Sequence, residues 1–194
     1  MLMEAIIISL VIGLIRGGKL KNFKRVNSKT KWSLIFGILI QYIIVFLSKS
    51  EEISGISKIL SYSKEILILS YILILIGLIG NINFRSLWIV ILGFIGNFLV
   101  FAMNNWKIPI LTEGIGFTDS VNLREVIETG ASKLYTPIVE GIKYPILGDI
   151  IIFAKPYPIP KIISIGDLLI AFGIFSLIQE IMLGKDSFMR GYRL

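Results

Sequence analysis

The chain contains no cysteine and no histidine among its 194 residues. Disulfide bonds, thiol nucleophiles, Ser-His-Asp triads and ordinary zinc sites are therefore excluded within this one chain. Any chemistry that the protein performs has to come from carboxylates, hydroxyls, amides or basic groups. We expect neither a metal nor a cofactor.

Charged residues are also scarce, at 17% of the chain, whereas apolar residues make up 55%. Five apolar runs stand out: Leu2 to Ile15, Ser33 to Leu47, Ile66 to Gly80, Leu87 to Met103 and Ile162 to Leu183. Most of them would form helices of about 21 to 26 Å, so flanking residues have to complete a bilayer core of about 30 Å. The runs predict an all-α membrane protein: a five-span transmembrane helical bundle, in one domain (1–194), placed as a multi-pass protein in the cell membrane.

The distribution of positive charge predicts an orientation. Seven basic residues and no acid separate the first two runs: Arg16, Lys19, Lys21, Lys24, Arg25, Lys29 and Lys31. The two segments on the other side, 48–65 and 104–161, each carry equal numbers of acids and bases. Because Lys/Arg bias orients membrane helices, we expect the N-terminus outside and the C-terminus inside, with Lys185, Arg190 and Arg193. The basic segment favours anionic lipid headgroups on the inside face as its partner, and no nucleic acid.

Five of the six prolines lie between Leu134 and Lys161, in the second half of the long outside loop, residues 104–161. They interrupt an apolar stretch from Tyr144 to Ala154, which either re-enters the membrane or caps the bundle, because broken backbone is tolerated at depth only where something satisfies it. Helical spacing of apolar residues predicts short helices near Ile53 to Leu60 and from Val121 to Thr129, the second ending at Gly130.

Polar and small residues recur at helical spacing inside the runs. Asn97 and Asn104 share a stripe with Gly93, and Gln41 pairs with Gly37. Because a polar amide in lipid is costly without a partner, both stripes are expected to face other helices, either as interhelical hydrogen bonds or as the lining of a cavity. A second small and polar face, expected to pack against the bundle, lies on the last run: Gly166, Gly173, Ser176 and Glu180.

Two aspartates occur in matching contexts, Leu147-Gly148-Asp149-Ile150 and Ile165-Gly166-Asp167-Leu168. Two carboxylates that share a proton can act as acid and base, as aspartyl peptide hydrolysis requires. Alternatively, Ser164 and Asp167 form a capping box at the start of the last helix. The Gly-x-Gly-Asp motif of intramembrane aspartyl proteases would need glycine in place of Ile146.

Several motifs together resemble one family. They are Gly17-Gly18, the run from Gly96-Asn97 to Asn104-Asn105 followed by Pro109, Leu147-Gly148-Asp149, and Ser164-Ile165-Gly166-Asp167-Leu168. This pattern is similar to an uncharacterised bacterial integral-membrane family known as a domain of unknown function (DUF5317). The chain departs from it after Asn105, where Trp106-Lys107 replaces a glycine pair. The resemblance implies a bacterial origin and the five-span plan, and it transfers no catalytic residues.

Two functions follow as expectations. The first is a membrane protein without catalytic activity that binds a small solute, a lipid or a partner membrane protein at its outside face. The second is an intramembrane aspartyl hydrolase that uses Asp149 and Asp167. The candidate ligand-binding residues are Gln41, Asn97, Asn104, Asn105, Asp149 and Asp167.

Overall fold

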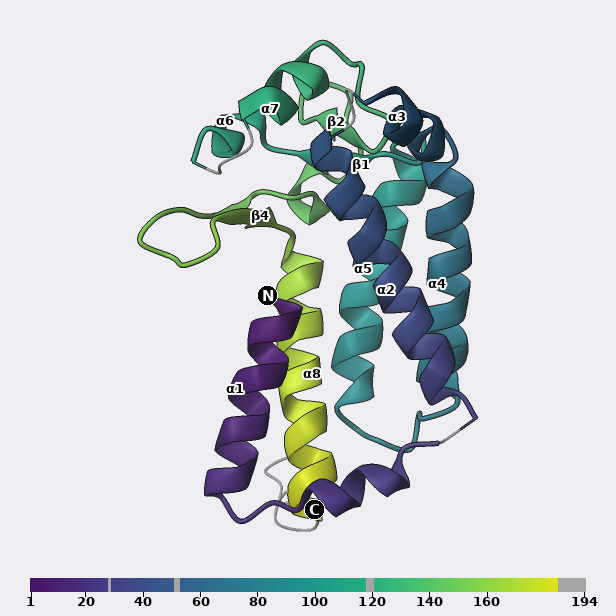
Figure 1. Cartoon of the computed structure of the whole chain (residues 1–194), viewed down its shortest axis with the longest axis vertical. Coiled ribbons are helices and arrows are strands. Elements are labelled where there is room, and N and C mark those ends of the chain that lie inside the picture. Colours follow the sequence, from purple (N-terminus) through teal and green to yellow (C-terminus); the bar gives the residue numbers. More distant parts are fainter. Residues whose placement is uncertain (28, 51–52, 118–120, 185–194) are drawn as a thin grey trace.

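Five long helices run alternately between two ends of the molecule in the computed structural model, which describes residues 1–27, 29–50, 53–117 and 121–184 (Figure 1). They are α1 (Leu2–Ile15), α2 (Lys31–Leu47), α4 (Ser63–Ile79), α5 (Leu87–Met103) and α8 (Ile165–Leu183). Each corresponds to one of the five apolar runs, so the mostly helical architecture is as predicted. The predicted inside residues Lys185, Arg190 and Arg193 lie outside the described residues.

Helix length alone does not establish five membrane spans. Within the described residues, one helix, α8 with 19 residues, is both long and apolar enough to cross a membrane. A second qualifies if α3 (Ser54–Leu60) and α4, which meet at an angle of 54°, are counted as one span. Helices α1, α2 and α5 are apolar, but they have 14 to 17 residues.

Small and polar residues hold the long helices together in pairs. Helix α1 packs on α8, where Gln179 Nε2 donates to the Ser9 backbone oxygen at 2.6 Å and Ser9 Oγ donates to the Phe175 oxygen at 2.7 Å. Helix α2 packs on α4, where Ser70 Oγ donates to the Gly37 oxygen at 2.8 Å. Helix α5 packs on α8, with Val90 against Gly173. The predicted glycine faces therefore do mark helix contacts.

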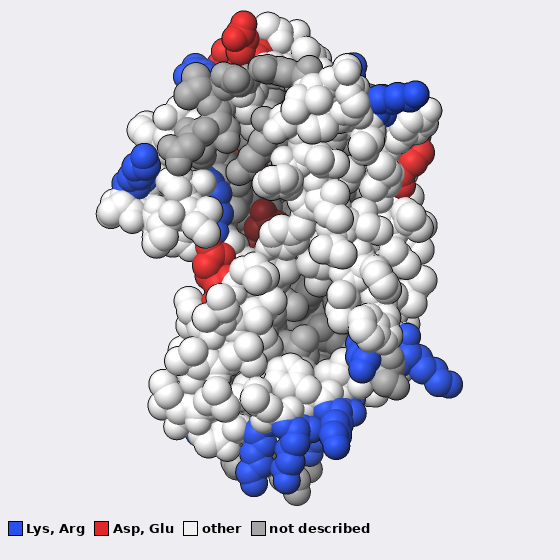
Figure 2. All heavy atoms as spheres, in the orientation of Figure 1, with Lys and Arg blue, Asp and Glu red and all other residues white. Residues whose placement is uncertain are grey.

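One end of the bundle is basic. The 3-10 helix η1 (Leu20–Arg25) joins α1 to α2 there, and the Lys19 backbone N–H and Asn22 Nδ2 both donate to the Met182 oxygen at the end of α8. Basic side chains gather at this end, the lower one in Figure 2.

The opposite end is covered by a cap built mainly from residues 104–161. Its strands are β1 (Ile108–Ile110) parallel to β2 (Tyr135–Pro137), and β3 (Ile151–Phe153) antiparallel to β4 (Lys161–Ile163). The short helices α6 (Thr112–Ile115), α7 (Val121–Glu128), α3, η2 (Ser48–Ser50) and η3 (Pro145–Leu147) complete this end. Helices α3 and α7 confirm the two predicted short helices, whereas the strands were not predicted.

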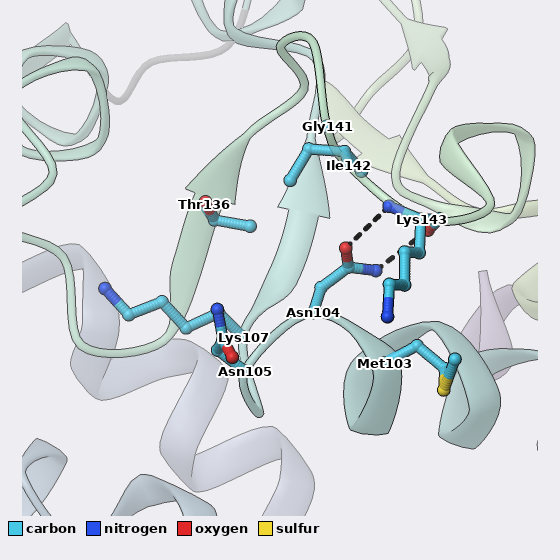
Figure 3. A pocket seen from close by; sticks show the side chains of 8 residues that line it. All are labelled: Met103, Asn104, Asn105, Lys107, Thr136, Gly141, Ile142 and Lys143. Atoms are coloured by element: carbon cyan, nitrogen blue, oxygen red, sulfur yellow. Dashed lines mark hydrogen bonds between the residues drawn. The ribbon is translucent and has the colours of Figure 1, made fainter.

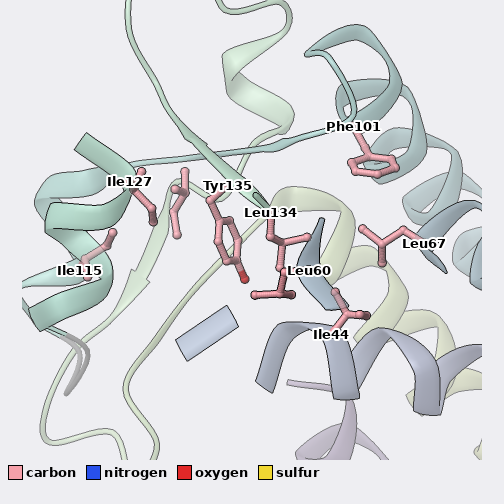
Figure 4. Packing of buried hydrophobic residues seen from close by; sticks show 9 residues of the cluster. Ile44, Leu60, Leu67, Phe101, Ile115, Ile127, Leu134 and Tyr135 are labelled. Atoms are coloured by element: carbon pink, nitrogen blue, oxygen red, sulfur yellow. The ribbon is translucent and has the colours of Figure 1, made fainter. Parts of the chain in front are cut away.

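An apolar core fastens the cap to the bundle. Leu60, Phe101 and Leu134 come from α3, α5 and the segment before β2, and each is almost fully buried (Figure 4). Because these residues are far apart in the sequence, their burial ties α3, α5 and the segment before β2 into one unit.

The sides of the long helices, by contrast, expose large apolar side chains. On α1, α2, α4 and α5 the following are about half exposed or more: Met3, Ile7, Ile8, Val11, Leu14, Ile15, Trp32, Phe36, Leu39, Phe46, Leu69, Ile72, Ile79, Trp88, Leu92 and Ile95. A surface of this kind is larger than the apolar patches that soluble proteins usually leave in water.

Candidate functional site

A polar cluster lies where the cap-side ends of α5 and α8 meet. Asn97 on α5 donates from Nδ2 to Asp167 Oδ1 at 2.8 Å, and its own Oδ1 accepts from Ser164 Oγ at 2.8 Å. The two helices can approach because Gly166 has no side chain, since a Cβ there would lie 2.8 Å from the Gly93 oxygen and would collide with the Asn97 amide. Asn97 therefore joins two helices, as its position on the glycine stripe predicts.

Asp167 and Ser164 form the predicted capping box. The Asp167 backbone N–H donates to Ser164 Oγ at 2.9 Å, and the Ser164 N–H donates to Asp167 Oδ2 at 3.4 Å. The carboxylate also complements the positive end of the α8 dipole. Both oxygens of Asp167 are thus engaged in holding the start of α8 and its contact with α5.

Asp149 is held in place by its backbone alone. Its N–H donates to the Pro109 oxygen at 2.8 Å, and its oxygen accepts from the Leu111 N–H at 2.9 Å, so the residue is bridged to β1. Its half-buried carboxyl accepts no hydrogen bond from any residue that the structure describes. Burial, and then the charge of Asp167, raise the pKa of Asp149 well above its usual range. The carboxyl is consequently available to a ligand, and its protonated form persists far above the pH at which an ordinary aspartate ionises.

Tyr135 on β2 is buried, and the charge of Asp149 acts on its hydroxyl. Burial, and then the charge of Asp149, raise the pKa of Tyr135, so its hydroxyl remains a hydrogen-bond donor. The surface is hollowed between the cap and the helices, and an acidic side chain is visible inside the hollow (Figure 2).

Asn104 and Asn105 belong to a different part of the molecule. Both line a cavity of about 400 Å³ at the cap-side end of α5, together with Met103, Lys107, Thr136, Gly141, Ile142 and Lys143 (Figure 3). Asn104 is buried and fixes the loop opposite it: its Nδ2 donates to the Lys143 oxygen and its Oδ1 accepts from the Lys143 N–H, each at 2.9 Å. The predicted site residues therefore separate into a carboxyl cluster with Asn97, and a polar cavity with Asn104.

Gln41 joins neither group through a hydrogen bond. It lies on α2 one turn after Gly37, partly exposed, and in the described part of the chain its amide has no hydrogen-bond partner. The expectation that Gln41 lines a cavity stays a prediction.

Sequence reasoning missed the role of Glu180. This buried residue on α8 accepts the backbone N–H groups of Arg85 and Ser86 at 3.2 and 3.0 Å, and the Ser86 hydroxyl at 2.8 Å. It therefore fixes the two residues that lead into α5, near the basic end of the bundle. Its spacing from Gly173 and Ser176 placed it on the inward face, but no sequence signal named its partner.

Glu4 was also not singled out as a contact. Lys161 Nζ and Tyr157 Oη both donate to its Oε1, the second at 3.0 Å, so the hairpin of β3 and β4 is tied to α1. Among the described residues no group of three or more acidic side chains could hold a metal ion.

Comparison with known proteins gives one match. The sequence model of a family of unknown function (DUF5317) matches residues 25–179, most of the chain. The matched region contains the carboxyl cluster and the polar cavity. No curated protein and no solved structure matches the chain. The chain therefore belongs to the DUF5317 family.

Proposed function

We propose that the chain is a five-span protein of the bacterial cell membrane, with the cap and N-terminus outside and the basic end inside. The exposed apolar sides of α1, α2, α4 and α5 support this, because lipid tails would cover what water would not. The seven basic residues between α1 and α2 support the orientation, since they lie at the end opposite the cap, where they would meet anionic headgroups.

The short helices are compatible with this proposal. A 17-residue helix such as α2 is about 26 Å long, a few ångströms less than a typical bilayer core. Local thinning of the bilayer, or flanking residues that snorkel, accommodates a shortfall of this size at modest cost. Trp32 and Trp88 both stand in the first turn of helices that start from the basic end, where indole rings prefer the interface.

The cap-covered end then supplies a binding site for a small solute on the outside face. The observation that carries this proposal is the Asp149 carboxyl, half-buried between cap and bundle without a hydrogen-bond partner among the described residues. A solute that donates hydrogen bonds, or carries a positive charge, would bind to this carboxyl without displacing a protein partner.

A thermal-shift screen of the purified protein against amines, amino acids and sugars tests the binding proposal. A true ligand should raise the Tm of the wild type and should fail to raise that of Asp149→Asn. Glu140→Gln, an exposed acid of the same cap, serves as the matched control and should retain the shift. Absence of any shift, or an equal shift in Asp149→Asn, would remove this site from the account.

The alternative is an intramembrane aspartyl hydrolase. It is favoured by the influence of Asp167 on the pKa of Asp149, which would leave one carboxyl protonated as an acid and the other ionised as a base. It is disfavoured because both oxygens of Asp167 already accept hydrogen bonds, one from Asn97 and the other from the Ser164 N–H. In a peptide-hydrolysis assay, a hydrolase would lose turnover in Asp149→Asn and in Asp167→Asn alike, whereas Ser164→Ala would keep it.

A further inference from the structure

A second polar site lies at the cap-side end of α5, separate from the carboxyl cluster. It is the cavity of about 400 Å³ lined by Asn104, Asn105, Lys107, Lys143 and their neighbours. A volume of this order is typical of small-ligand sites and exceeds what one or two water molecules need. Its character is opposite to that of the carboxyl cluster: two of the eight lining residues are lysines and none is acidic.

The cavity is preformed by a strained turn. Asn105 and Trp106 have φ values of 55° and 60°, the left-handed region that side chains other than glycine rarely adopt. At Trp106 side-chain packing offsets the backbone strain, because its ring contacts Phe98 and Phe101 at centroid distances of 6.4 and 5.6 Å. Consecutive strained residues of this kind concentrate at functional sites. Here the turn brings Asn105 and Lys107 to the rim.

The opposite wall is equally fixed. Asn104 holds the backbone of Lys143 through two hydrogen bonds, which Figure 3 draws as dashed lines. Gly141, with a φ of 96°, lets the loop turn back toward the cavity. A rigid site of this kind does not spend binding energy on ordering itself when a ligand enters.

The ammonium groups of Lys107 and Lys143 both have N–H donors left for a ligand. Lys143 Nζ makes no hydrogen bond or ion pair with any residue in the described ranges. Lys107 Nζ donates to the Ser132 oxygen at 2.6 Å, which uses one of its three protons. In Figure 3 the two side chains extend from opposite sides of Asn104. An anion in the cavity would therefore meet the unpaired Lys143 ammonium group, with Lys107 at the other edge of the cavity, and would displace no acidic neighbour in the lining.

We propose that this cavity binds a phosphate group. The phosphate has two possible sources, a free anion outside the cell or a lipid headgroup. The lipid source rests on the proposed membrane location: Leu99 and Met103, about 40% exposed on α5 beside the cavity, would then face acyl chains while the headgroup reached the lysines. The free-anion source is independent of that proposal, and so is independent of the Asp149 site.

Binding to the delipidated full-length protein in detergent tests this proposal. Inorganic phosphate would be titrated by calorimetry, and phosphatidylglycerol by native mass spectrometry with phosphatidylcholine as the zwitterionic comparison. We expect saturable binding of phosphate, of phosphatidylglycerol in preference to phosphatidylcholine, or of both. Phosphate binding alone identifies a free anion, and preferential lipid binding alone identifies a headgroup.

Substitutions locate the site. Lys143→Gln and Lys107→Gln should each weaken binding by about tenfold, as expected for the loss of one charge-assisted hydrogen bond. Lys143→Arg should retain it. Lys58→Gln, an exposed lysine of α3 at the same end of the molecule, is the matched control and should bind within about twofold of the wild type.

Two results would overturn the proposal. One is a wild-type protein that binds neither phosphate nor the anionic lipid above the zwitterionic one, which requires no variant to fold. The other is equal binding by wild type, Lys107→Gln and Lys143→Gln, each with an unchanged Tm, since the anion would then lie elsewhere.

Discussion

At the scale of single residues, the two aspartates of the matching Gly-Asp motifs have different surroundings. Asp167 accepts hydrogen bonds at both oxygens, whereas the carboxyl of Asp149 accepts none from the described residues. The motif predicted that both would lie near the cap-side end of the bundle. It could not predict that backbone hydrogen bonds to β1, whose last residue lies 39 positions earlier, would fix Asp149 at this end.

Asp149→Asn should stabilise the protein at neutral pH. The pKa of Asp149 is raised in the folded state, so the folded protein holds a proton that the unfolded chain releases, and stability falls as pH rises above about 4 toward the raised pKa. The asparagine side chain does not ionise, so the substitution removes this pH-dependent loss of stability. We expect a gain on the order of 1 kcal/mol at pH 7, about 2–4 °C in Tm, and a flatter Tm profile between pH 4 and 8. An unchanged profile would mean that Asp149 ionises normally.

Ser164→Ala should cost about 1–2 kcal/mol, because it removes the α8 cap and also leaves Asn97 Oδ1 without its donor. Ser61→Ala is a suitable control: its exposed hydroxyl bonds only to the Lys58 oxygen in its own helix. Its effect should stay within about 0.5 kcal/mol. Equal losses in the two variants, measured by thermal unfolding in detergent, would contradict the capping role.

At the scale of elements, helix positions could be predicted closely and strands could not. The runs Leu2 to Ile15 and Leu87 to Met103 coincide with α1 and α5, because apolar composition dominates those segments. The last run begins at Ile162, but β4 occupies residues 161–163 and α8 begins at Ile165. Three-residue strands have no periodic signal of their own, and β1 pairs with β2 only because the cap folds back on itself.

Glycine spacing predicted the helix contacts, and two glycines on facing helices test that prediction. Gly166→Ala should destabilise the contact of α5 with α8 by about 1–3 kcal/mol, because its Cβ would meet the Asn97 amide and the Gly93 oxygen. Gly96→Ala on α5 is the control, since its Cβ would meet no heavy atom within 4 Å. Alanine there should be neutral or stabilising, as the better helix former. A Tm that falls equally in both variants would mean that glycine matters for flexibility and not for close approach.

Glu180 supplies the corresponding test at the other end of α5. Glu180→Ala should cost about 2–4 kcal/mol, because it leaves the buried N–H and hydroxyl of Ser86, and the part-buried N–H of Arg85, without an acceptor. Glu65→Ala, on the first turn of α4 and more exposed, should change stability by less than about 0.5 kcal/mol. Similar losses in both would show that the buried contact contributes little.

At the scale of the whole molecule, the main feature is how apolar and charged surfaces are distributed. The long helices are apolar on their outer sides, one end is basic, and the other end bears a cap with mixed charges, a carboxyl cluster and a lysine-lined cavity. Composition and charge predicted the helices and the basic end. The cap could not be predicted, because its sites depend on the contacts of Asn97, Asn104 and Asp149 with segments distant in the sequence.

The orientation of the molecule in a membrane is the central claim, and cysteine labelling tests it most directly, because the native chain has no cysteine. Ala131→Cys places a thiol on the exposed cap, and Lys24→Cys places one at the exposed basic end. With a membrane-impermeant maleimide, intact cells should label Ala131→Cys and should label Lys24→Cys only after permeabilisation. The reverse pattern would invert the orientation, and equal labelling of both variants before permeabilisation would contradict the five-span arrangement.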